Sequence, residues 1–341
     1  MGDPAGIGPE IIASALARDQ VHGLCRPLVI GDASVMTKAT GFAGGSLSVR
    51  SISDVVEARF DRNTIDVYDL KNVDIKRLQL GTVSAMAGHA AFEAVRHMIE
   101  LAKSGKIAAT VTAPIHKEAL VAAGHHFPGH TEIFAHFTGT SDFTMMLAAG
   151  NLRVVHVSTH VSLRQACDAV TRQRVLKVIE LGHEACRRLG IARPKVGVAG
   201  LNPHASDGGL FGSEEREHII PACEAARAKG IDVHGPQPPD TFFAKAVNGA
   251  YDICVAMYHD QGHIPVKCKG FKYDAATERW TSVNGINVSL GLPIIRTSVD
   301  HGTAFDQAGK GTASDASLLD AIEYAARLAA NQCLIPSPGL H

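Results

Sequence analysis

Three histidines follow short apolar stretches of the chain. His160 closes VVHVSTH, His204 closes VGVAGLNPH and His259 closes ICVAMYH. Because ligands of α/β sheets bind outside the carboxyl ends of the strands, we expect these imidazoles to face a common crevice. Neutral imidazoles bind Zn, Co, Mn or, less typically, Mg, and three of them leave coordination positions for substrate. The pattern predicts a divalent-metal site, although each histidine alone would more simply cap its strand.

Two further side chains lie where a proton could be transferred. Asp260 directly follows His259, and Lys117 stands in TAPIHKE, just after a predicted strand. A lysine acts as an acid–base group when burial favours its neutral form. We predict proton-transfer roles for both residues. The alternatives are an exposed carboxylate and an ordinary lysine at the start of a helix.

A set of cationic and polar groups suits an anionic substrate. His130 and Thr131 follow a Pro-Gly turn, Lys267 lies shortly after His259, and Arg296 ends the apolar run 292–295. Such groups bind a phosphate or carboxylate, and arginine adds bidentate geometry. Each of them alone reads more simply as an exposed charge.

Two glycine-rich loops are of interest. GDPAGIGPE, residues 2–10, either presents backbone N–H groups to an anion at a helix N-terminus or forms a tight turn. DHGTAFDQAGKGTA, residues 300–313, combines small residues with Asp306, which can accept from ribose hydroxyls. Neither loop is a Rossmann fingerprint or a Walker P-loop.

These groups need strands and helices to position them, and the apolar pattern indicates an α/β fold with a largely parallel sheet. The predicted buried strands are Pro27–Gly31, Ile107–Thr112, Arg153–Thr159, Lys195–Ala199 and Tyr251–Met257. The predicted helices are Gly88–Lys103, Thr171–Leu189, Glu214–Lys229 and Leu318–Ala330. The polar stretch Gly270–Gly285 is predicted to be a surface hairpin or lid.

Length and composition limit the class of protein. The 341 residues, 45% of them hydrophobic, favour two domains with sizeable cores. Lys and Arg number 33 against 34 Asp and Glu, so nucleic acid is not an expected partner. No apolar run is long enough for a membrane span, and the seven cysteines, Cys333 among them, contain no Cys-x-x-Cys pair. We expect a soluble, reduced, cytoplasmic protein.

Seven motifs, distributed over nearly the whole chain, resemble the 4-hydroxythreonine-4-phosphate dehydrogenase family. The motifs are GDPAGIGPE, VTAPIHKEAL, FPGHTE, LNPHASDGGLFGSEE, PPDT, AMYHDQGHIPVK and GLPIIRTSVDHGTAFDQAGKG. PPDT and YHDQGHIPVK look closer to the branch that acts on D-threonate or D-erythronate 4-phosphate. HGTAFDQAGKG also resembles the adenosine-binding loop of isocitrate and isopropylmalate dehydrogenases, which implies NAD binding without a Rossmann fold.

The resemblance implies two α/β/α domains with the active site in the interdomain cleft, and a homodimer whose partner subunit completes each site. The expected domains are 1–125 plus 285–341 on the cofactor side, and 126–284 for substrate, metal and dimerisation. The implied metal ligands are His160, His204 and His259. The implied substrate-binding residues are His130, Thr131, Lys267, Asn287 and Arg296, and the cofactor-binding residues are His301, Gly302, Thr303 and Asp306.

The implied reaction is a metal-dependent, NAD-linked oxidation with decarboxylation of a 4-phosphorylated 3-hydroxy acid. The substrate is D-threonate or D-erythronate 4-phosphate, or 4-hydroxythreonine 4-phosphate. Asp306 would repel the 2′-phosphate of NADP and favours NAD. The alternatives are a non-redox metal-dependent lyase for phosphorylated sugar acids, a cis-dihydrodiol dehydrogenase of the same family and a non-catalytic two-lobed binding protein.

This sequence departs from the family in two places. An apolar strand usually precedes GDPAGIGPE, whereas here Met1 does, so we expect either an upstream natural start or a shortened first sheet. The stretch Gly270–Gly285 is longer than the usual link between Lys267 and Asn287, and we expect this insert to bear on which substrate is accepted.

Overall fold

The computed structural model describes residues 1–45, 47–276 and 278–331, with backbone alone for 279–282, so Cys333 lies outside the described residues. The chain forms two compact units. Unit 1 comprises Met1–Ser141 and Leu292–Ala326, and unit 2 comprises Asp142–Gly291 and the chain from Arg327 onward. Both units alternate strands with helices, so the predicted α/β class is confirmed. In the described part of the chain, no helix has the length and apolar character of a membrane span.

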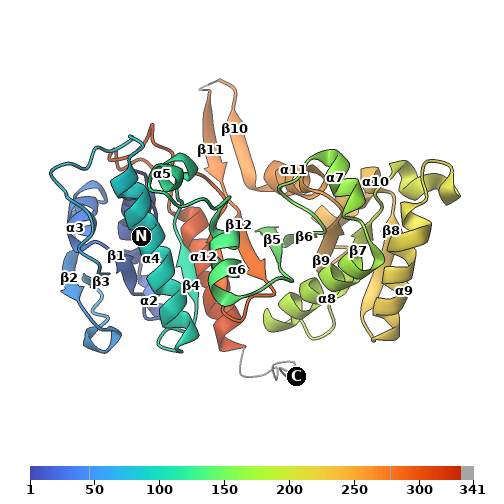
Figure 1. Ribbon diagram of the computed structural model, residues 1–341, viewed down its shortest axis with the longest axis horizontal. Coiled ribbons are helices and arrows are strands. Elements are labelled where there is room, and N and C mark those ends of the chain that lie inside the picture. The colour runs from blue at the N-terminus through green and yellow to red at the C-terminus, as the bar shows by residue number, and fades with distance from the viewer. Residues whose placement is uncertain (46, 277, 332–341) are drawn as a thin grey trace. The chain divides into compact units, whose positions relative to one another are not determined.

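Unit 1 contains two parallel arrangements of strands (Figure 1). Its strands are β1 (Val29–Gly31), β2 (Ser48–Ile52), β3 (Thr64–Asp69), β4 (Thr110–Thr112) and β13 (Arg296–Val299). Strand β3 lies between β1 and β2, and β13 pairs with β4 so that Arg296 is opposite Thr110 and Ser298 is opposite Thr112. This register places alternate side chains of β4 and β13 on one face.

The helices of unit 1 pack on these strands with small apolar side chains. They are α1 (Gly8–Leu16), α2 (Asp19–Leu24), α3 (Ala33–Phe42), α4 (Ala85–Lys103), α5 (Lys117–Ala122), α6 (His130–Thr138) and most of α12 (Ala316–Ala330). Helix α4 begins three residues before its predicted start because the Ser84 side chain accepts a hydrogen bond from the Ala87 N–H. Its buried face includes Ala87, Ala91 and Met98, at helical spacing.

The sheet of unit 2 is mixed. Its strands are β5 (Thr144–Ala149), β6 (Leu152–His156), β7 (Lys195–Ala199), β8 (Asp232–Gln237), β9 (Ile253–Ala256) and β12 (Ile286–Leu290), in the order β12-β5-β6-β9-β7-β8. The last four strands of this order are parallel, as predicted, but β5 runs antiparallel to both its neighbours. The tight turn at Gly150 and Asn151, with Gly150 at φ +57°, makes β5 and β6 a hairpin.

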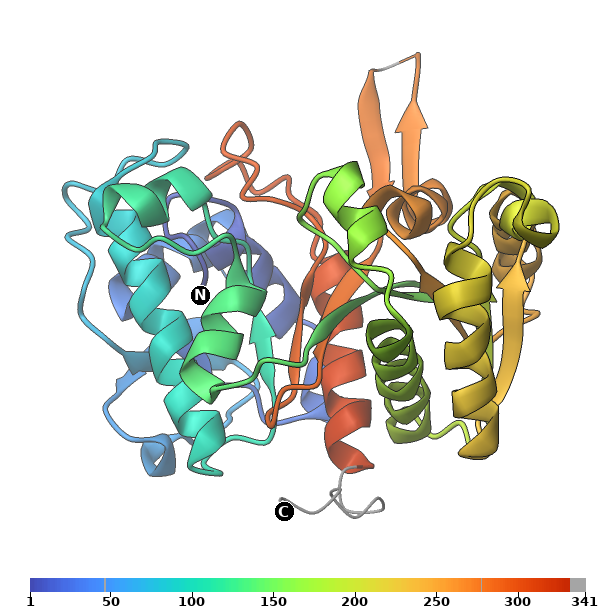
Figure 2. The same ribbon diagram turned by 45° about the vertical axis from the view of Figure 1, so that its right-hand side comes forward.

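Unit 2 also carries a long hairpin that projects from its body (Figures 1 and 2). Its strands, β10 (Phe271–Asp274) and β11 (Arg279–Val283), pair antiparallel, so the hairpin predicted for Gly270–Gly285 is confirmed. The helices of unit 2 are α7 (Leu163–Asp168), α8 (Arg172–Arg188), α9 (Ile220–Ala228), α10 (Pro239–Val247) and α11 (His259–Gly270). Helix α11 leads directly into the hairpin, which therefore begins close in sequence to His259.

The contact between α4 and α5 depends on a glycine. A Cβ atom on Gly88 would overlap with the backbone carbonyl of Ala119. We predict that Gly88→Ala lowers the free energy of unfolding by about 3 kcal/mol, because backbone must move to admit the methyl group. Gly41→Ala in α3, where no atom lies within 4 Å of the new Cβ, is the matched control. Urea unfolding should show no loss for the control; equal losses in both variants would contradict the close approach.

Candidate functional site

Arg296 is a buried cation at the start of β13. The residue is only 2% exposed. Its Nη2 atom donates a hydrogen bond to the Thr112 hydroxyl on β4 at 2.9 Å. The guanidinium also lies 5.7 Å from the centre of the Phe134 ring. Burial lowers the pKa of Arg296 to about 9, while the charge of Glu132 opposes that shift. The side chain therefore remains positive at neutral pH.

His130, the first residue of α6, lies within electrostatic reach of this cation. Its Nε2 atom is buried and has no hydrogen-bond partner among the residues that the structure describes. Burial, and then the charge of Arg296, lowers the pKa of His130 well below its usual range. A neutral imidazole with an unused nitrogen can donate to or accept from a bound ligand. Thr131 lies in the same first helical turn.

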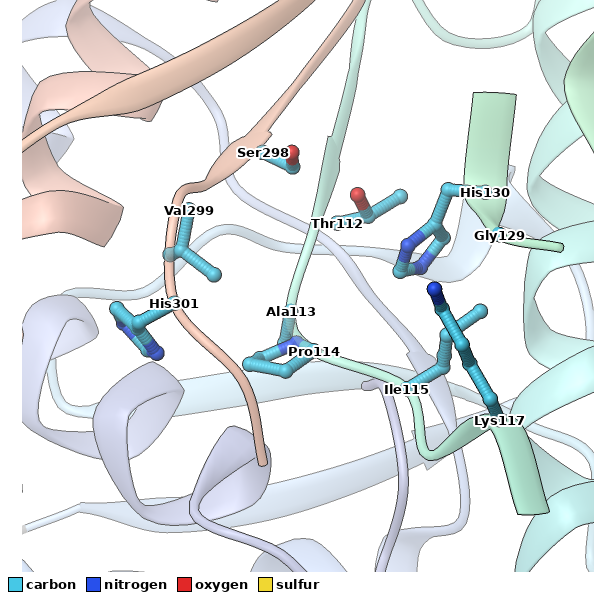
Figure 3. A pocket seen from close by; sticks show the side chains of 10 residues that line it. All are labelled: Thr112, Ala113, Pro114, Ile115, Lys117, Gly129, His130, Ser298, Val299 and His301. Carbon is cyan, nitrogen blue, oxygen red and sulfur yellow. The ribbon is translucent and has the colours of Figure 1, made fainter. Parts of the chain in front are cut away.

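A cavity of about 130 Å³ in unit 1 adjoins His130. It is lined by Thr112, Ala113, Pro114, Ile115, Lys117, Gly129, His130, Ser298, Val299 and His301. Figure 3 shows the Lys117 side chain extending from the start of α5 toward the His130 ring. Lys117 is exposed, so the burial on which its predicted proton-transfer role depended is not observed. The hydroxyl groups of Thr112 and Ser298 belong to the lining but were not predicted from the sequence.

Four histidines of unit 2 form a series of neighbouring rings, which we call the histidine column. The members are His160, His259, His263 and His156. The ring centres of His160 and His259 are 5.9 Å apart, and His259 stacks on His263 at 3.5 Å. The ring centre of His156 lies 4.7 Å from that of His263. Burial lowers the pKa of His263 to about 4 and that of His156 to about 3. These two rings are therefore neutral at pH 7.

In two of the predicted metal ligands, the Nδ1 atom of the imidazole pairs with a nearby carboxylate. The Nδ1 atom of His259 lies 2.6 Å from Asp260 Oδ1, and Nδ1 of His204 lies 3.2 Å from Asp207 Oδ2. This arrangement leaves Nε2 available, which is typical of metal-binding histidines. Within the described residues of this single chain, however, no three His, Cys, Asp or Glu side chains gather as a metal site. The chain brings His160 and His259 together but does not complete the predicted trio.

The backbone around His204 is held in an unusual conformation. Residues His204–Gly208 all have positive φ, between 45° and 72°. Non-glycine residues rarely adopt this left-handed region, and runs of it are found where surrounding structure enforces them. Here the carboxylate of Glu215, only 1% exposed, accepts the backbone N–H groups of Leu201 and Asn202 at 2.8 Å each. Glu215 thereby anchors the segment that enters the left-handed run.

The other predicted substrate-binding residues lie in unit 2, whereas His130, Thr131 and Arg296 lie in unit 1. The Lys267 ammonium in α11 lies 4.3 Å from the centre of the Phe271 ring. Asn287, in β12, directs its amide toward the Met145 sulfur. The predicted set is thus divided between two parts of the chain.

The predicted cofactor loop follows β13 and packs against the other glycine-rich loop. The buried Thr303 accepts the Ile7 N–H through its backbone carbonyl at 3.0 Å, and Phe305 stacks on His116 with ring centres 4.5 Å apart. His301 Nδ1 lies 3.0 Å from the Gly302 carbonyl oxygen. The Asp306 side chain is exposed. The loop therefore presents Asp306 outward while residues 2–10 support it from behind.

Comparison with known proteins identifies the family of this chain. Residues 23–325 match the family described as pyridoxal phosphate biosynthetic protein PdxA. The chain belongs to the PdxA family. It is 51% identical to a D-threonate 4-phosphate dehydrogenase of Cupriavidus necator over 330 residues, which is 96% of each protein. The family predicted from the sequence motifs is thus confirmed.

Two solved structures relate the PdxA fold to this chain. A 4-hydroxythreonine-4-phosphate dehydrogenase of Burkholderia phymatum is 47% identical, with a TM-score of 0.81 and 96% of both chains covered. A terephthalate 1,2-cis-dihydrodiol dehydrogenase of Burkholderia xenovorans is 32% identical, with a TM-score of 0.65 and the same coverage. The likeness is greater to the phosphate-named enzyme than to the dihydrodiol dehydrogenase.

The buried His156 predicts how stability depends on pH. Its pKa falls from about 6.5 in the unfolded chain to about 3 in the folded protein. The unfolded state therefore binds more protons between these values, and stability falls as pH decreases below about 6.5. We predict that His156→Leu reduces this pH dependence by about 1.4 kcal/mol per pH unit between pH 6 and pH 4. Urea unfolding at several pH values, with a chelator present, measures how the free energy of unfolding changes with pH. An equal pH dependence in His156→Leu and in the wild type would show that His156 does not titrate as described.

Proposed function

We propose that this chain is a metal-dependent, NAD-linked dehydrogenase that oxidises and decarboxylates a 4-phosphorylated 3-hydroxy acid. D-threonate 4-phosphate is the first candidate, because the relative from Cupriavidus necator, 51% identical, carries that name. D-erythronate 4-phosphate and 4-hydroxythreonine 4-phosphate share the same reactive groups. The observation that carries the proposal is the Nε2 atom of His130, which lines the cavity of unit 1 without a hydrogen-bond partner among the described residues, together with the buried Arg296, whose charge lowers the pKa of His130.

We infer that this cavity receives an anionic part of the substrate. Arg296 supplies a fixed positive charge. His130 supplies a nitrogen for hydrogen bonding and remains neutral at pH 7, because its pKa is lowered. The Thr112 hydroxyl orients the guanidinium, and Lys117 adds a second cation at the rim. Bidentate contacts between a guanidinium and a phosphate are short and directional. Binding energy gained at the phosphate would fix the 3-hydroxyl for reaction. Thr131, Lys267 and Asn287 are proposed to complete substrate binding.

The donor set of unit 2 supports a divalent metal ion. His160 and His259 are neighbours, and the carboxylates on His259 and His204 leave the Nε2 atoms for coordination. When bound, such an ion supplies Lewis acidity at the substrate hydroxyl and stabilises negative charge on the oxygen during decarboxylation. Asp260 orients His259, and we propose that it also takes part in proton transfer.

We infer that a homodimer completes the trio of imidazoles. An exposed apolar side chain follows each predicted ligand within six residues in the sequence: Leu163 after His160, Leu210 after His204, and Ile264 after His259. Their exposed fractions are 63%, 75% and 59%. Exposed apolar groups that gather around a polar site are typical of interfaces. A second copy of the chain would cover these side chains and bring the remaining imidazole to the site.

NAD is proposed to bind at residues 300–313 and to accept the hydride. The exposed Asp306 would accept hydrogen bonds from the ribose hydroxyls, and His301, Gly302 and Thr303, at the start of the loop, are proposed to contact the cofactor. In the balanced reaction, the C3 alcohol becomes a ketone: the hydrogen on C3 leaves as a hydride that reduces NAD, and the proton of the hydroxyl group is released. The bond between C1 and C2 then breaks to release CO₂, and C2 takes up a proton. Lys117 is the proposed proton donor, a role that a charged ammonium can fill from its exposed position at the cavity without being buried.

The activity can be tested directly with the three phosphorylated acids. We predict NADH formation and CO₂ release with D-threonate 4-phosphate, NAD and a divalent ion, and none after chelation. Arg296→Ala should raise KM by about 10- to 100-fold, because a charged hydrogen bond contributes about 1.5–3 kcal/mol. The NADH absorbance band follows the reaction, with unphosphorylated D-threonate as the control substrate. Product formed without NADH would instead identify a lyase, and turnover of a dihydrodiol alone would exclude the phosphorylated substrates.

Metal binding can be tested separately from turnover. We predict that His259→Ala weakens Zn²⁺ or Co²⁺ binding at least tenfold, because the variant loses a coordinating imidazole. His234→Ala is the matched control, since His234 also pairs with a carboxylate, Asp232, at 2.9 Å but lies in β8. Calorimetric titration of both variants measures the affinities. Equal affinities in the wild type and in His259→Ala would remove His259 from the metal site.

A further inference from the structure

The first glycine-rich loop serves as a support for the second. A Cβ atom on Gly6 would lie 2.9 Å from the Thr303 carbonyl oxygen, so only glycine allows this approach. The neighbouring Ile7 donates its N–H to the same carbonyl at 3.0 Å. The backbone at Gly6 and Ile7 therefore packs directly against Thr303, near the start of the segment 300–313. Of the two uses that the sequence left open for this loop, an anion site or a tight turn, the observed contacts favour a turn with a supporting role.

Glu10 extends this support to the far end of the loop. It is only 5% exposed, and its Oε2 atom accepts the Gly309 N–H at 3.0 Å. Burial raises the pKa of Glu10, while the backbone N–H groups of Gly309, Gly311 and Ala313 favour its charged form and oppose the rise. A carboxylate in the first turn of a helix ordinarily interacts with that helix's own N-terminus. Glu10 instead bonds a segment 299 residues away in the sequence.

The loop itself needs an external support of this kind. Ala304 has φ +40°, a conformation that costs a non-glycine residue free energy and persists only when neighbouring structure enforces it. Gly309 and Gly311 also have positive φ, and side chains there would overlap with Leu80 and with the Phe42 carbonyl. The loop is thus fitted closely onto unit 1 through backbone contacts. A buried carboxylate costs free energy unless it is hydrogen-bonded. The burial of Glu10 is therefore favourable only while the loop supplies its hydrogen bond.

We propose that Glu10 is a positioning residue for the dinucleotide site: its carboxylate holds residues 300–313 in the conformation that binds NAD. The inference rests on the proposed function for its cofactor, but the effect on the loop is independent of any cofactor. Glu10 does not touch the substrate or the reacting atoms. It acts through the hydrogen bond that its Oε2 atom accepts from the Gly309 N–H, and electrostatically through the N–H groups of Gly311 and Ala313.

The experiment compares Glu10→Ala and Glu10→Gln with Ser14→Ala, one helical turn further along α1. Ser14 donates to Asp315 at 2.8 Å, so the control removes a partly buried hydrogen bond from the same helix to a residue outside the loop. Hydrogen exchange of the cofactor-free protein reports on residues 300–313, and NADH titration reports on affinity. We expect at least tenfold faster exchange in the loop and about tenfold weaker NADH binding for Glu10→Ala, with substrate KM unchanged. Glu10→Gln, which keeps an acceptor but loses the charge, should be intermediate, and Ser14→Ala should lie within twofold of the wild type.

The outcomes separate the two proposals. If Glu10→Ala lowers the melting temperature but leaves loop exchange and NADH affinity within twofold of Ser14→Ala, Glu10 has a structural role alone and the inference is wrong. If the wild type binds no NADH, the proposed cofactor fails, while loop exchange still decides the role of Glu10. Should Glu10→Ala not fold, Glu10→Gln provides the same comparison, and wild-type exchange in that variant would overturn the inference.

Discussion

The burial of Arg296 is the constraint on which unit 1 is organised. An arginine that is 2% exposed needs polar partners, because an uncompensated buried charge costs several kcal/mol. The register between β13 and β4 meets this need by bringing the Thr112 hydroxyl to the guanidinium. The same short strand ends at Val299 and delivers the chain into residues 300–313. One strand pairing therefore fixes both the cation and the starting point of the loop.

The two units hold their polar groups in different charge states. Unit 1 concentrates positive charge, with Arg296 cationic and His130 kept neutral beside it. Unit 2 instead contains two imidazoles, His263 and His156, whose pKa values burial lowers so that they are neutral at pH 7. The first environment suits an oxyanion, and the second suits a cation, since neutral imidazole is the form that coordinates metals. The cation of unit 1 and the imidazoles of unit 2 come from different segments of the chain, and each set lies within one unit.

Much of the framework could be predicted from local pattern, and the exceptions have physical causes. The strand Lys195–Ala199 is observed as predicted because its apolar residues are buried on both faces. The strand expected at Arg153–Thr159 ends at His156, so His160 lies on a loop beyond it. Arg296 was expected to close an apolar run but instead opens β13, after Gly291 at φ +91° and Pro293. Turn geometry, and not hydrophobicity, sets that boundary.

Site residues were predictable by type, but their partners depended on the fold. Helical spacing from His259 already indicates the stacked His263, since residues four apart share a helix face. Thr112 and Glu10 gave no such local signal. Their contacts join segments that are 184 and 299 residues apart, so only the folded chain brings them to Arg296 and to the cofactor loop.

The left-handed run at His204–Gly208 has a consequence for how the protein loses its native state. Four of its residues carry side chains, and each costs about 1–2 kcal/mol in this conformation, a cost that is released when the segment rearranges. The free energy of opening this segment is therefore smaller than that of the sheet beneath it. On warming, the geometry around His204 should disappear while the two units remain folded. If His204 serves the proposed metal site, activity would then be lost before the two units unfold.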